Sequence, residues 1–382
     1  MSLYQVYAQY PIELVSAKGM ELTDSNGVKY TDYYGGHAVI SIGHSHPHYV
    51  KSLTEQLEHI GFYSNVVLNR FQEELAERLN AKLNEDYALF LCNSGAEANE
   101  NALKLASFKT GRKKVLSFKG SFHGRTSAVV AATDNPSIVA PLNAGHEVDF
   151  IPFGDHKQLE LLLATEKYCA VIVETIQGVG GLDQPSLDFA SGINEQCKKT
   201  GTLLIADEVQ SGFGRSGSFF SFQRFDLEPD FITMAKGMGN GFPVGGVLIH
   251  EKHEAVKSEL GTTFGGNYLA CRAALAVLDV LEDEDLIANA RDLESHFRAE
   301  VERLGIEAKI KGAGLMIGLD FGKPTAALRK TLIEESHLFV GSSSNPNVVR
   351  ILPPLNCTKE ALSTLLSEIK RLSRKNTPAL EI

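Results

Sequence analysis

The stretch LLIADEVQSG, residues 203–212, is an apolar run that ends in two adjacent acids, Asp207 and Glu208. Continuous apolar residues are typical of a strand buried on both faces, as in a mostly parallel sheet covered by helices. Neighbouring residues of a strand point to opposite faces, so we expect the two acids to have different surroundings and different roles. The stretch predicts a buried strand with functional polar groups at its carboxyl end.

Apolar runs of this kind follow one another between about residues 88 and 250. A Gly-rich or polar turn, and usually a helical pattern, separates each run from the next. This alternation predicts an α/β fold with a mostly parallel, seven-stranded sheet covered by helices. The runs are ALFLC (88–92), KVLSF (114–118), VDFIP (148–152), AVIVE (170–174), LLIAD (203–207), DFITM (230–234) and VGGVLI (244–249).

The two ends of the chain lack the regular alternation of strands and helices found in the middle, and they predict a smaller α+β domain. Near the start, residues 21–33 alternate around Asn26-Gly27, a pair typical of hairpin turns. We predict that residues 1–50 join the small domain, that 51–290 form the large domain and that 291–382 form the rest of the small one. Helical patterns lie at 71–83, 96–109, 268–287 and 359–372.

Composition and charge narrow the class of protein. The chain has 382 residues, 43% of them hydrophobic, which is enough for a large core. Its formal net charge of -10 gives no general attraction to phosphate backbones or anionic lipid, so we expect neither nucleic acid nor membrane as a partner. The N-terminus lacks a secretory pattern, and no apolar run approaches the roughly 20 residues of a spanning helix. Five widely spaced cysteines favour buried free thiols, and we predict a cytoplasmic protein.

Polar residues of interest stand at the carboxyl ends of the predicted strands. In open α/β sheets the binding crevice lies outside these ends, so the residues that follow each run belong together. They are Asn93-Ser94-Gly95, Ser121-Phe122-His123-Gly124-Arg125, Glu174 with Gln177-Gly178, Asp207-Glu208-Val209-Gln210, and Lys236.

Each of these groups also has an ordinary structural interpretation. The helix start can bind an anion through its free N–H groups, or it can simply be capped by Asn93 or Ser94. Phe122 is either a core aromatic or a flat face for a planar ligand. Arg125 is either a surface ion-pairing group or a carboxylate clamp. Lys236 is either solvated or a desolvated amine suited to a Schiff base.

The combination of these groups is more informative than any one of them. Pyridoxal phosphate (PLP) needs an anion cradle for its phosphate, a stacking face for its ring, an acid that keeps its pyridine nitrogen protonated and an amine for its aldehyde. The helix start, Phe122, Asp207 and Lys236 match these four needs. The residues therefore favour a PLP enzyme.

In the order of its motifs the chain resembles the class III aminotransferases of the acetylornithine and ornithine type. The resemblance covers nearly the whole chain and includes the 29-residue step from Asp207 to Lys236. It implies the PLP fold of aspartate aminotransferase, with a large PLP-binding domain and a smaller one. The motifs are GHSHP (43–47), NSGAEANE (93–100), SFHGRT (121–126), ETIQG (174–178), DEVQSGFGR (207–215), MAKGMGNGFPVGG (234–246), TTFGGN (262–267) and VVRILPPL (348–355).

The resemblance implies a role for each residue around the cofactor ring. Lys236 is expected to form the bond to the cofactor and then to move a proton between the substrate carbon and cofactor atom C4′. Asp207 pairs with the pyridinium nitrogen, and Gln210 reaches the ring hydroxyl. Val209 packs on one ring face and Phe122 stacks on the other.

Further residues are implied to hold the cofactor phosphate. Ser94, Gly95 and Ala96 form the cradle. Thr263 is expected to reach the phosphate of the neighbouring subunit's cofactor, so a homodimer with shared active sites is implied.

Two arginines are implied to bind the substrates. Arg125 matches the arginine that binds the carboxylate far from the reacting amine, and Arg350 matches the one that receives the α-carboxylate of glutamate. The implied reaction transfers the ω-amine of an N-acylated ornithine to 2-oxoglutarate. Glu174 is a further candidate for contact with the substrate.

One position departs from the family pattern. After ETIQG, relatives usually carry a Glu that masks the glutamate-binding arginine, whereas this chain has Val179. An unmasked Arg350 disfavours a second free cation nearby, so we expect N-acetylornithine or N-succinylornithine as the donor rather than free ornithine. Simple repacking around Val179 is the alternative, and ornithine or another ω-amino acid then stays open as the donor.

Other functions fit the sequence less well. His44, His46 and His48 alternate in GHSHPH and allow a metal-dependent hydrolase, but that hypothesis leaves Lys236 without a role. Neither a G-x-x-x-x-G-K-[ST] phosphate loop nor a G-x-S-x-G nucleophile motif is present. We expect Glu208 to be structural, because it points away from the ring that Asp207 faces.

Overall fold

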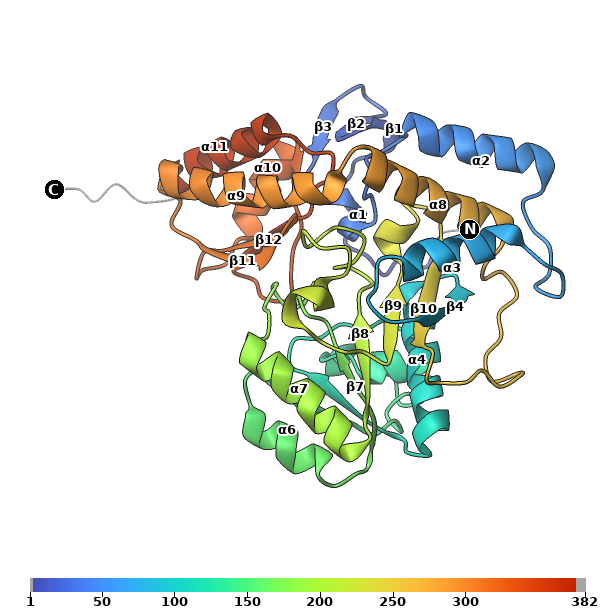
Figure 1. Ribbon diagram of the computed structural model, residues 1–382. Helices are drawn as coiled ribbons and strands as arrows, with labels where there is room; N and C mark the ends of the chain where they lie inside the picture. Colours follow the sequence, from blue (N-terminus) through green and yellow to red (C-terminus); the bar gives the residue numbers. More distant parts are fainter. Residues whose placement is uncertain (1–2, 376–382) are drawn as a thin grey trace.

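A seven-stranded sheet lies at the centre of the larger part of the molecule in the computed structural model, which describes residues 3–375 (Figure 1). The strand order is β4-β10-β9-β8-β7-β5-β6. β10 is antiparallel to both of its neighbours, and the other pairs are parallel. All seven predicted runs are strands, so the α/β prediction is confirmed. Their bounds are β4 (Tyr87–Cys92), β5 (Lys114–Phe118), β6 (Val148–Ile151), β7 (Tyr168–Val173), β8 (Leu203–Asp207), β9 (Phe231–Met234) and β10 (Gly245–His250).

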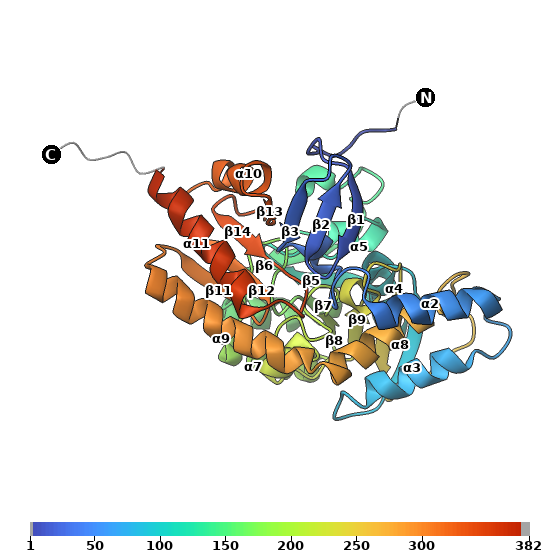
Figure 2. The same cartoon turned by 90° about the horizontal axis from the view of Figure 1, so that it is seen from above.

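Helices cover both faces of this sheet, with α4 on one side and α6 and α7 on the other (Figures 1 and 2). Short 3-10 turns lie at Pro136–Ile138 (η1), Ser221–Phe225 (η2) and Lys236–Met238 (η3). The helices are α1 (Gly35–Ala38), α2 (Pro47–His59), α3 (Arg70–Asn80), α4 (Gly95–Thr110), α5 (Ser127–Ala131), α6 (His156–Leu163), α7 (Leu187–Thr200), α8 (Tyr268–Asp283), α9 (Leu286–Leu304), α10 (Ala326–Glu334) and α11 (Lys359–Lys375).

Strand β7 shows why its apolar residues are continuous. Val171 belongs to the core cluster that contains Phe189 of α7, whereas its neighbour Ile172 belongs to the cluster that contains Ala98 of α4. Successive residues of the strand thus enter different helix-covered layers, and both layers exclude water.

The helix predicted over residues 268–287 is present but ends earlier, because α8 ends at Asp283 and the next helix, α9, begins at Leu286. Asp285 adopts a left-handed conformation with φ 46, which a continuous right-handed helix does not allow.

The two ends of the chain come together, as predicted, beside the large sheet. β1 (Leu14–Lys18), β2 (Glu21–Asp24) and β3 (Lys29–Asp32) form antiparallel pairs, with Gly27 at φ 81 in the predicted hairpin turn. β3 also pairs in parallel with β13 (Leu338–Phe339) from the far end of the chain. A separate sheet joins β11 (Lys309–Ala313), β12 (Met316–Asp320) and β14 (Val348–Ile351). The domain boundaries at residues 50 and 290 stay a proposal.

The described part of the chain contains no helix with the length and apolar character needed to cross a membrane. All five cysteines are free and buried, as expected.

Candidate active site

Asp207 stands at the carboxyl end of β8 and is held by three donors. Nδ2 of Asn99 donates to its Oδ2 at 2.8 Å, and Nδ1 of His123 lies 2.7 Å from the same oxygen. The N–H of Val209 donates to Oδ1 at 3.1 Å. The side chain is only 4% exposed, so these contacts fix the direction of a buried carboxylate.

Asn99 and His123 position Asp207, a role that the sequence had not indicated for either residue. Oδ1 of Asn99 accepts from the Thr233 hydroxyl at 2.6 Å, which orients the Asn99 amide so that its NH2 faces Asp207. His123 is fully buried, and its second nitrogen lies 3.4 Å from the Ser117 hydroxyl. A buried polar residue on the apolar face of α4 was the available signal for Asn99.

Glu208 faces away from Asp207, as predicted. Its Oε1 accepts from the Phe222 N–H at 2.7 Å, and its Oε2 accepts from the Ser221 N–H and the Ser211 hydroxyl, both at 2.9 Å. These contacts hold the start of η2 against the end of β8. Burial raises the pKa of Glu208 to about 7.

Lys236 follows β9, the strand next to β8, and has an unusual backbone conformation. Its φ of 46 is left-handed, which is costly for a residue with a side chain and is typical of functional sites. Burial lowers the pKa of the Lys236 amine, while the charges of Asp207 and Glu174 oppose that shift. An amine with a lowered pKa is more often neutral and hence more nucleophilic.

The turn that carries Lys236 is tied to the N-terminal segment. Oδ1 of Asn240 accepts from the backbone N–H groups of Ser41 and Ile42, and its Nδ2 donates to the Gly43 carbonyl. The Ser41 hydroxyl donates to the Gly237 carbonyl at 2.7 Å. Residues about 200 positions apart thus position the lysine together.

The start of α4 forms an open anion site. Ser94 is the N-cap and accepts from the Glu97 N–H at 3.2 Å, so the N–H groups of Gly95 and Ala96 have no acceptor within the helix. A Cβ on Gly95 would lie 2.5 Å from Cγ1 of Val209, so only glycine fits. Val209 therefore lies directly beside the start of α4.

Phe122 and Glu174 are joined at the ends of β5 and β7. The Phe122 N–H donates to Oε1 of Glu174 at 2.8 Å, and the Gly178 N–H donates to Oε2 at 3.0 Å. Burial raises the pKa of Glu174 to about 7. The exposed guanidinium of Arg125 lies 6.0 Å from the centre of the Phe122 ring, which places a cation at the rim of the site.

Arg350 of β14 approaches the site from the C-terminal sheet. It is 3% exposed and donates to the carbonyls of Gly178 and Ser342 and to the Tyr34 hydroxyl, the last at 3.0 Å. Nη1 also lies 3.5 Å from Oε1 of Gln210, whose Nε2 donates to the His37 carbonyl at 3.3 Å. Within residues 3–375, every acceptor of an Arg350 hydrogen bond is uncharged.

Thr263 lies apart from these groups, on the surface. Its side chain is exposed, and within residues 3–375 no hydrogen bond holds it. The neighbouring Phe264 is 60% exposed and touches the half-exposed ring of Phe62, with 5.2 Å between the ring centres.

The three histidines of GHSHPH contact three different acids. His44 lies 2.9 Å from Asp32, His46 lies 2.9 Å from Glu284, and His48 lies 2.7 Å from Asp279. No group of three metal-ligating side chains gathers anywhere in residues 3–375. The geometry gives the metal-hydrolase hypothesis no support.

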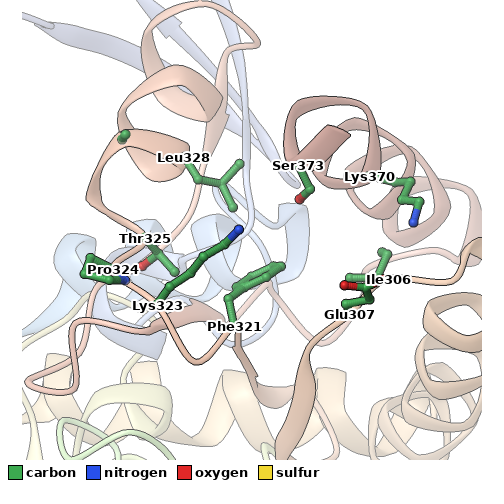
Figure 3. A pocket seen from close by; sticks show the side chains of 10 residues that line it. Ile306, Glu307, Phe321, Lys323, Pro324, Thr325, Leu328, Lys370 and Ser373 are labelled. Atoms are coloured by element: carbon green, nitrogen blue, oxygen red, sulfur yellow. The ribbon is translucent and has the colours of Figure 1, made fainter. Parts of the chain in front are cut away.

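A cavity of about 510 Å³ lies in the C-terminal part of the molecule (Figure 3). Phe321 and Leu328 contribute apolar lining, and Lys323 and Lys370 contribute cations. None of the described residues that line it was predicted to bind cofactor or substrate.

The fold and the groups at the strand ends define an aminotransferase of the PLP-dependent kind. The class III aminotransferase family model matches residues 4–372, so the chain belongs to that family. It is 38% identical over 379 residues to the acetylornithine aminotransferase of Bacillus subtilis, covering 97% of each chain. It is 40% identical over 361 residues to that of Archaeoglobus fulgidus, covering 94% of each.

Solved structures agree with this assignment. The acetylornithine aminotransferase of Elizabethkingia anophelis matches with a TM-score of 0.83 and 31% identity, over 97% of this chain and 96% of that one. The ornithine aminotransferase of Toxoplasma gondii matches with a TM-score of 0.89 and 26% identity, over 97% and 93%. Another structure of the T. gondii enzyme is described with PLP at its active site. The protein is a PLP-dependent transaminase that acts on amino and 2-oxo acids.

Proposed function

We propose that this protein transfers the δ-amino group of N-acetylornithine to 2-oxoglutarate, giving the acylated glutamate semialdehyde and glutamate, as a step of arginine biosynthesis. Relatives named acetylornithine aminotransferase are 35% to 40% identical over nearly the whole chain. The observation that carries the proposal is Arg350, a buried guanidinium whose hydrogen-bond acceptors are all uncharged within the described residues.

The residues around the cofactor divide the work between them. Bound PLP supplies an electron sink for the substrate carbon. Asp207 would pair with the pyridine nitrogen and keep it protonated, and Lys236 would move the proton at the reacting carbon. Phe122 and Val209 would pack on the two faces of the ring, and Gln210 would hydrogen-bond to its hydroxyl.

The phosphate and the substrates have their own residues. Ser94, Gly95 and Ala96 would bind the phosphate at the start of α4. Arg125 at the rim would bind the carboxylate remote from the reacting amine, and Arg350 would bind the α-carboxylate of the 2-oxo acid. Glu174 supports Phe122 through the Phe122 N–H.

Val179 supports an acylated donor over free ornithine. Val179 leaves the charge of Arg350 uncompensated, so a donor with a free α-ammonium group would bring a second cation into the site, whereas an acetamide is neutral and a succinamide adds an anion. N-succinylornithine is therefore the second candidate donor, and Arg350 is the observation that favours it.

Donor competition tests this proposal. The cofactor-loaded enzyme is mixed with N-acetylornithine, N-succinylornithine or ornithine, and the loss of its yellow absorption band gives kcat/KM for each. We expect both acylated donors to exceed ornithine by about tenfold or more, which corresponds to about 1.4 kcal/mol. A preference for free ornithine would overturn the assignment.

We also propose that the protein forms a homodimer. Exposed apolar side chains gather in the 60–68 segment and around Phe264, and such patches mark interaction surfaces. Thr263 lies in this region and would reach a partner's cofactor phosphate. The exposed apolar side chains are Ile60 at 38%, Phe62 at 44%, Tyr63 at 57%, Val66 at 83%, Val67 at 47%, Leu68 at 87% and Phe264 at 60% exposure.

Sedimentation of the purified protein tests the dimer. We expect a dimer mass, and we expect Thr263→Ala to weaken retention of the cofactor while leaving that mass unchanged. A monomer with full activity would contradict the proposal. Five buried free thiols support a reducing, cytoplasmic compartment.

A further inference from the structure

Tyr34 connects Arg350 to His37 through its hydroxyl. Nη2 of Arg350 donates to this hydroxyl at 3.0 Å, and Nδ1 of His37 lies 2.5 Å from it. A guanidinium only donates, so the hydroxyl oxygen accepts from Arg350 and is left to give its own proton to His37. Nδ1 of His37 is then the acceptor, and the ring carries its proton on Nε2.

The Tyr34 ring packs closely against Gly341 and Arg350. Its ring lies 5.5 Å from Cζ of Arg350 and packs over Gly341, where an added Cβ would come within 2.2 Å of the tyrosine Cε2. Gly341 and Arg350 are also joined by two backbone hydrogen bonds, at 2.8 and 3.0 Å. The tyrosine ring therefore occupies space that glycine alone leaves open beside the arginine.

His37 is held in place by an unusual backbone. Gly35, Gly36, His37 and Ala38 all have positive φ, at 56, 53, 68 and 63. Left-handed geometry costs roughly 1–2 kcal/mol for each residue with a side chain, and such strain is typical of functional sites. Asp32 supports the turn, because its Oδ1 accepts from the N–H groups of Tyr34 and Gly35 at 2.9 and 2.8 Å.

We propose that Tyr34 and His37 form a neutral cap on Arg350, which satisfies the buried guanidinium while the ω-amine donor is bound and is displaced by the α-carboxylate of the 2-oxo acid. The inference rests on the proposed function, because it assigns Arg350 to that carboxylate. The ω-carbon of the donor carries no carboxylate, so Arg350 needs another acceptor in that half-reaction.

The neutrality of the cap is what makes exchange possible. A hydroxyl fills the hydrogen-bonding need of Arg350 but leaves its positive charge in place, so an incoming carboxylate gains a charge-assisted pair when it replaces the hydroxyl. Burial and the charges of Arg350 and Lys236 lower the pKa of His37, which agrees with a neutral ring. Tyr34 and His37 therefore act as specificity-determining residues that select between the two substrates.

The test measures the two half-reactions of the cofactor-loaded enzyme separately. In Tyr34→Phe, we expect kcat/KM for the ω-amine donor to fall about tenfold, as for loss of a hydrogen bond to a charged group. For 2-oxoglutarate we expect no fall, because no hydroxyl has to leave. His37→Asn keeps the left-handed backbone, which Asn tolerates. It should lower kcat/KM for the donor, relative to kcat/KM for 2-oxoglutarate, by about threefold.

Binding of glutarate provides a readout that is independent of turnover. This dicarboxylate has neither an amine nor a keto group, so it binds without reacting. We expect calorimetry to show about three- to tenfold tighter glutarate binding to Tyr34→Phe than to the unaltered enzyme. Tyr33→Phe is the matched control, because its hydroxyl donates to the Ala361 carbonyl instead, and it should change neither readout.

The outcomes separate the cap from the reaction. Equal losses in both half-reactions, or glutarate binding that is unchanged or weaker in Tyr34→Phe, would overturn the cap. Failure of the unaltered enzyme to react with any ω-amine donor would overturn the proposed function, and the glutarate measurement would still decide the cap.

Discussion

The cofactor side and the substrate side of the site are built differently. Asp207 is fixed by three donors, and two of the residues that supply them, Asn99 and His123, are buried. Arg350 instead meets carbonyls and one hydroxyl, and Arg125 is exposed. A cofactor that stays in place suits a rigid seat, whereas two substrates that alternate need contacts that can be exchanged.

We expect the largest effect on activity from a change of Lys236. Lys236→Ala removes the group that we propose moves the proton, so kcat should fall by more than roughly 10³-fold, within the range of acid–base catalysis. Borohydride treatment should then fix no cofactor to the protein, as judged by mass spectrometry. Lys323→Ala, at the remote cavity, is the control and should keep both properties. Retention of full activity by Lys236→Ala would sink the mechanism.

The rigid side predicts a pH dependence of stability through Glu208. Its pKa is about 7 in the folded protein and 4.5 in the reference state, so the folded protein holds this proton more tightly. The stabilisation is therefore fully present below pH 4.5 and is lost as the pH rises through about 7. Over this window the free energy of unfolding should fall by up to about 3 kcal/mol.

Urea unfolding of Glu208→Gln across the same window checks this expectation. We expect the variant to be less stable at every pH, because an amide nitrogen cannot accept the two hydrogen bonds that Oε2 accepts. The readout is therefore the slope of the free energy of unfolding against pH. The slope should flatten but not vanish, since burial also raises the pKa of Glu174 to about 7. An unchanged slope would mean that Glu208 is ionised in the folded protein throughout.

The donors around Asp207 allow a direct test of the rigid seat. His123→Ala removes the contact at Nδ1 and leaves a buried carboxylate with one donor fewer, so kcat should fall about tenfold. His123→Asn retains a donor near that position and should recover part of the loss. The pH at which the absorption of the bound cofactor changes should move in His123→Ala, whereas a merely structural role would leave it unmoved.

The sequence predicted the sheet well and indicated candidate cofactor residues, because both leave local signals. Continuous apolar runs mark the strands, and the motifs stand at their ends. Contacts across the chain leave no such signal: Asn99 and His123 are 108 and 84 positions from Asp207. The same holds for Tyr34, which is 316 positions from Arg350. The break between α8 and α9 depends on the backbone of Asp285, which helical periodicity does not reveal.

The smallest effect is expected at the exposed rim, where water competes with every contact. Arg125→Ala should raise KM for both substrates by about tenfold or less, because an exposed ion pair is worth at most about 1 kcal/mol and a carboxylate clamp only somewhat more. The absorption of the bound cofactor should stay unchanged, since Arg125 lies 6.0 Å from the centre of the Phe122 ring and, within residues 3–375, forms no hydrogen bond or ion pair with Ser94, Gly95 or Ala96. Arg224, also exposed and 5.6 Å from a phenylalanine ring, is the matched control and should leave KM unaltered when changed to Ala. A shift in the cofactor spectrum of Arg125→Ala would show that the rim and the cofactor seat are coupled, and the contrast between an exchangeable substrate side and a fixed cofactor side would then fail.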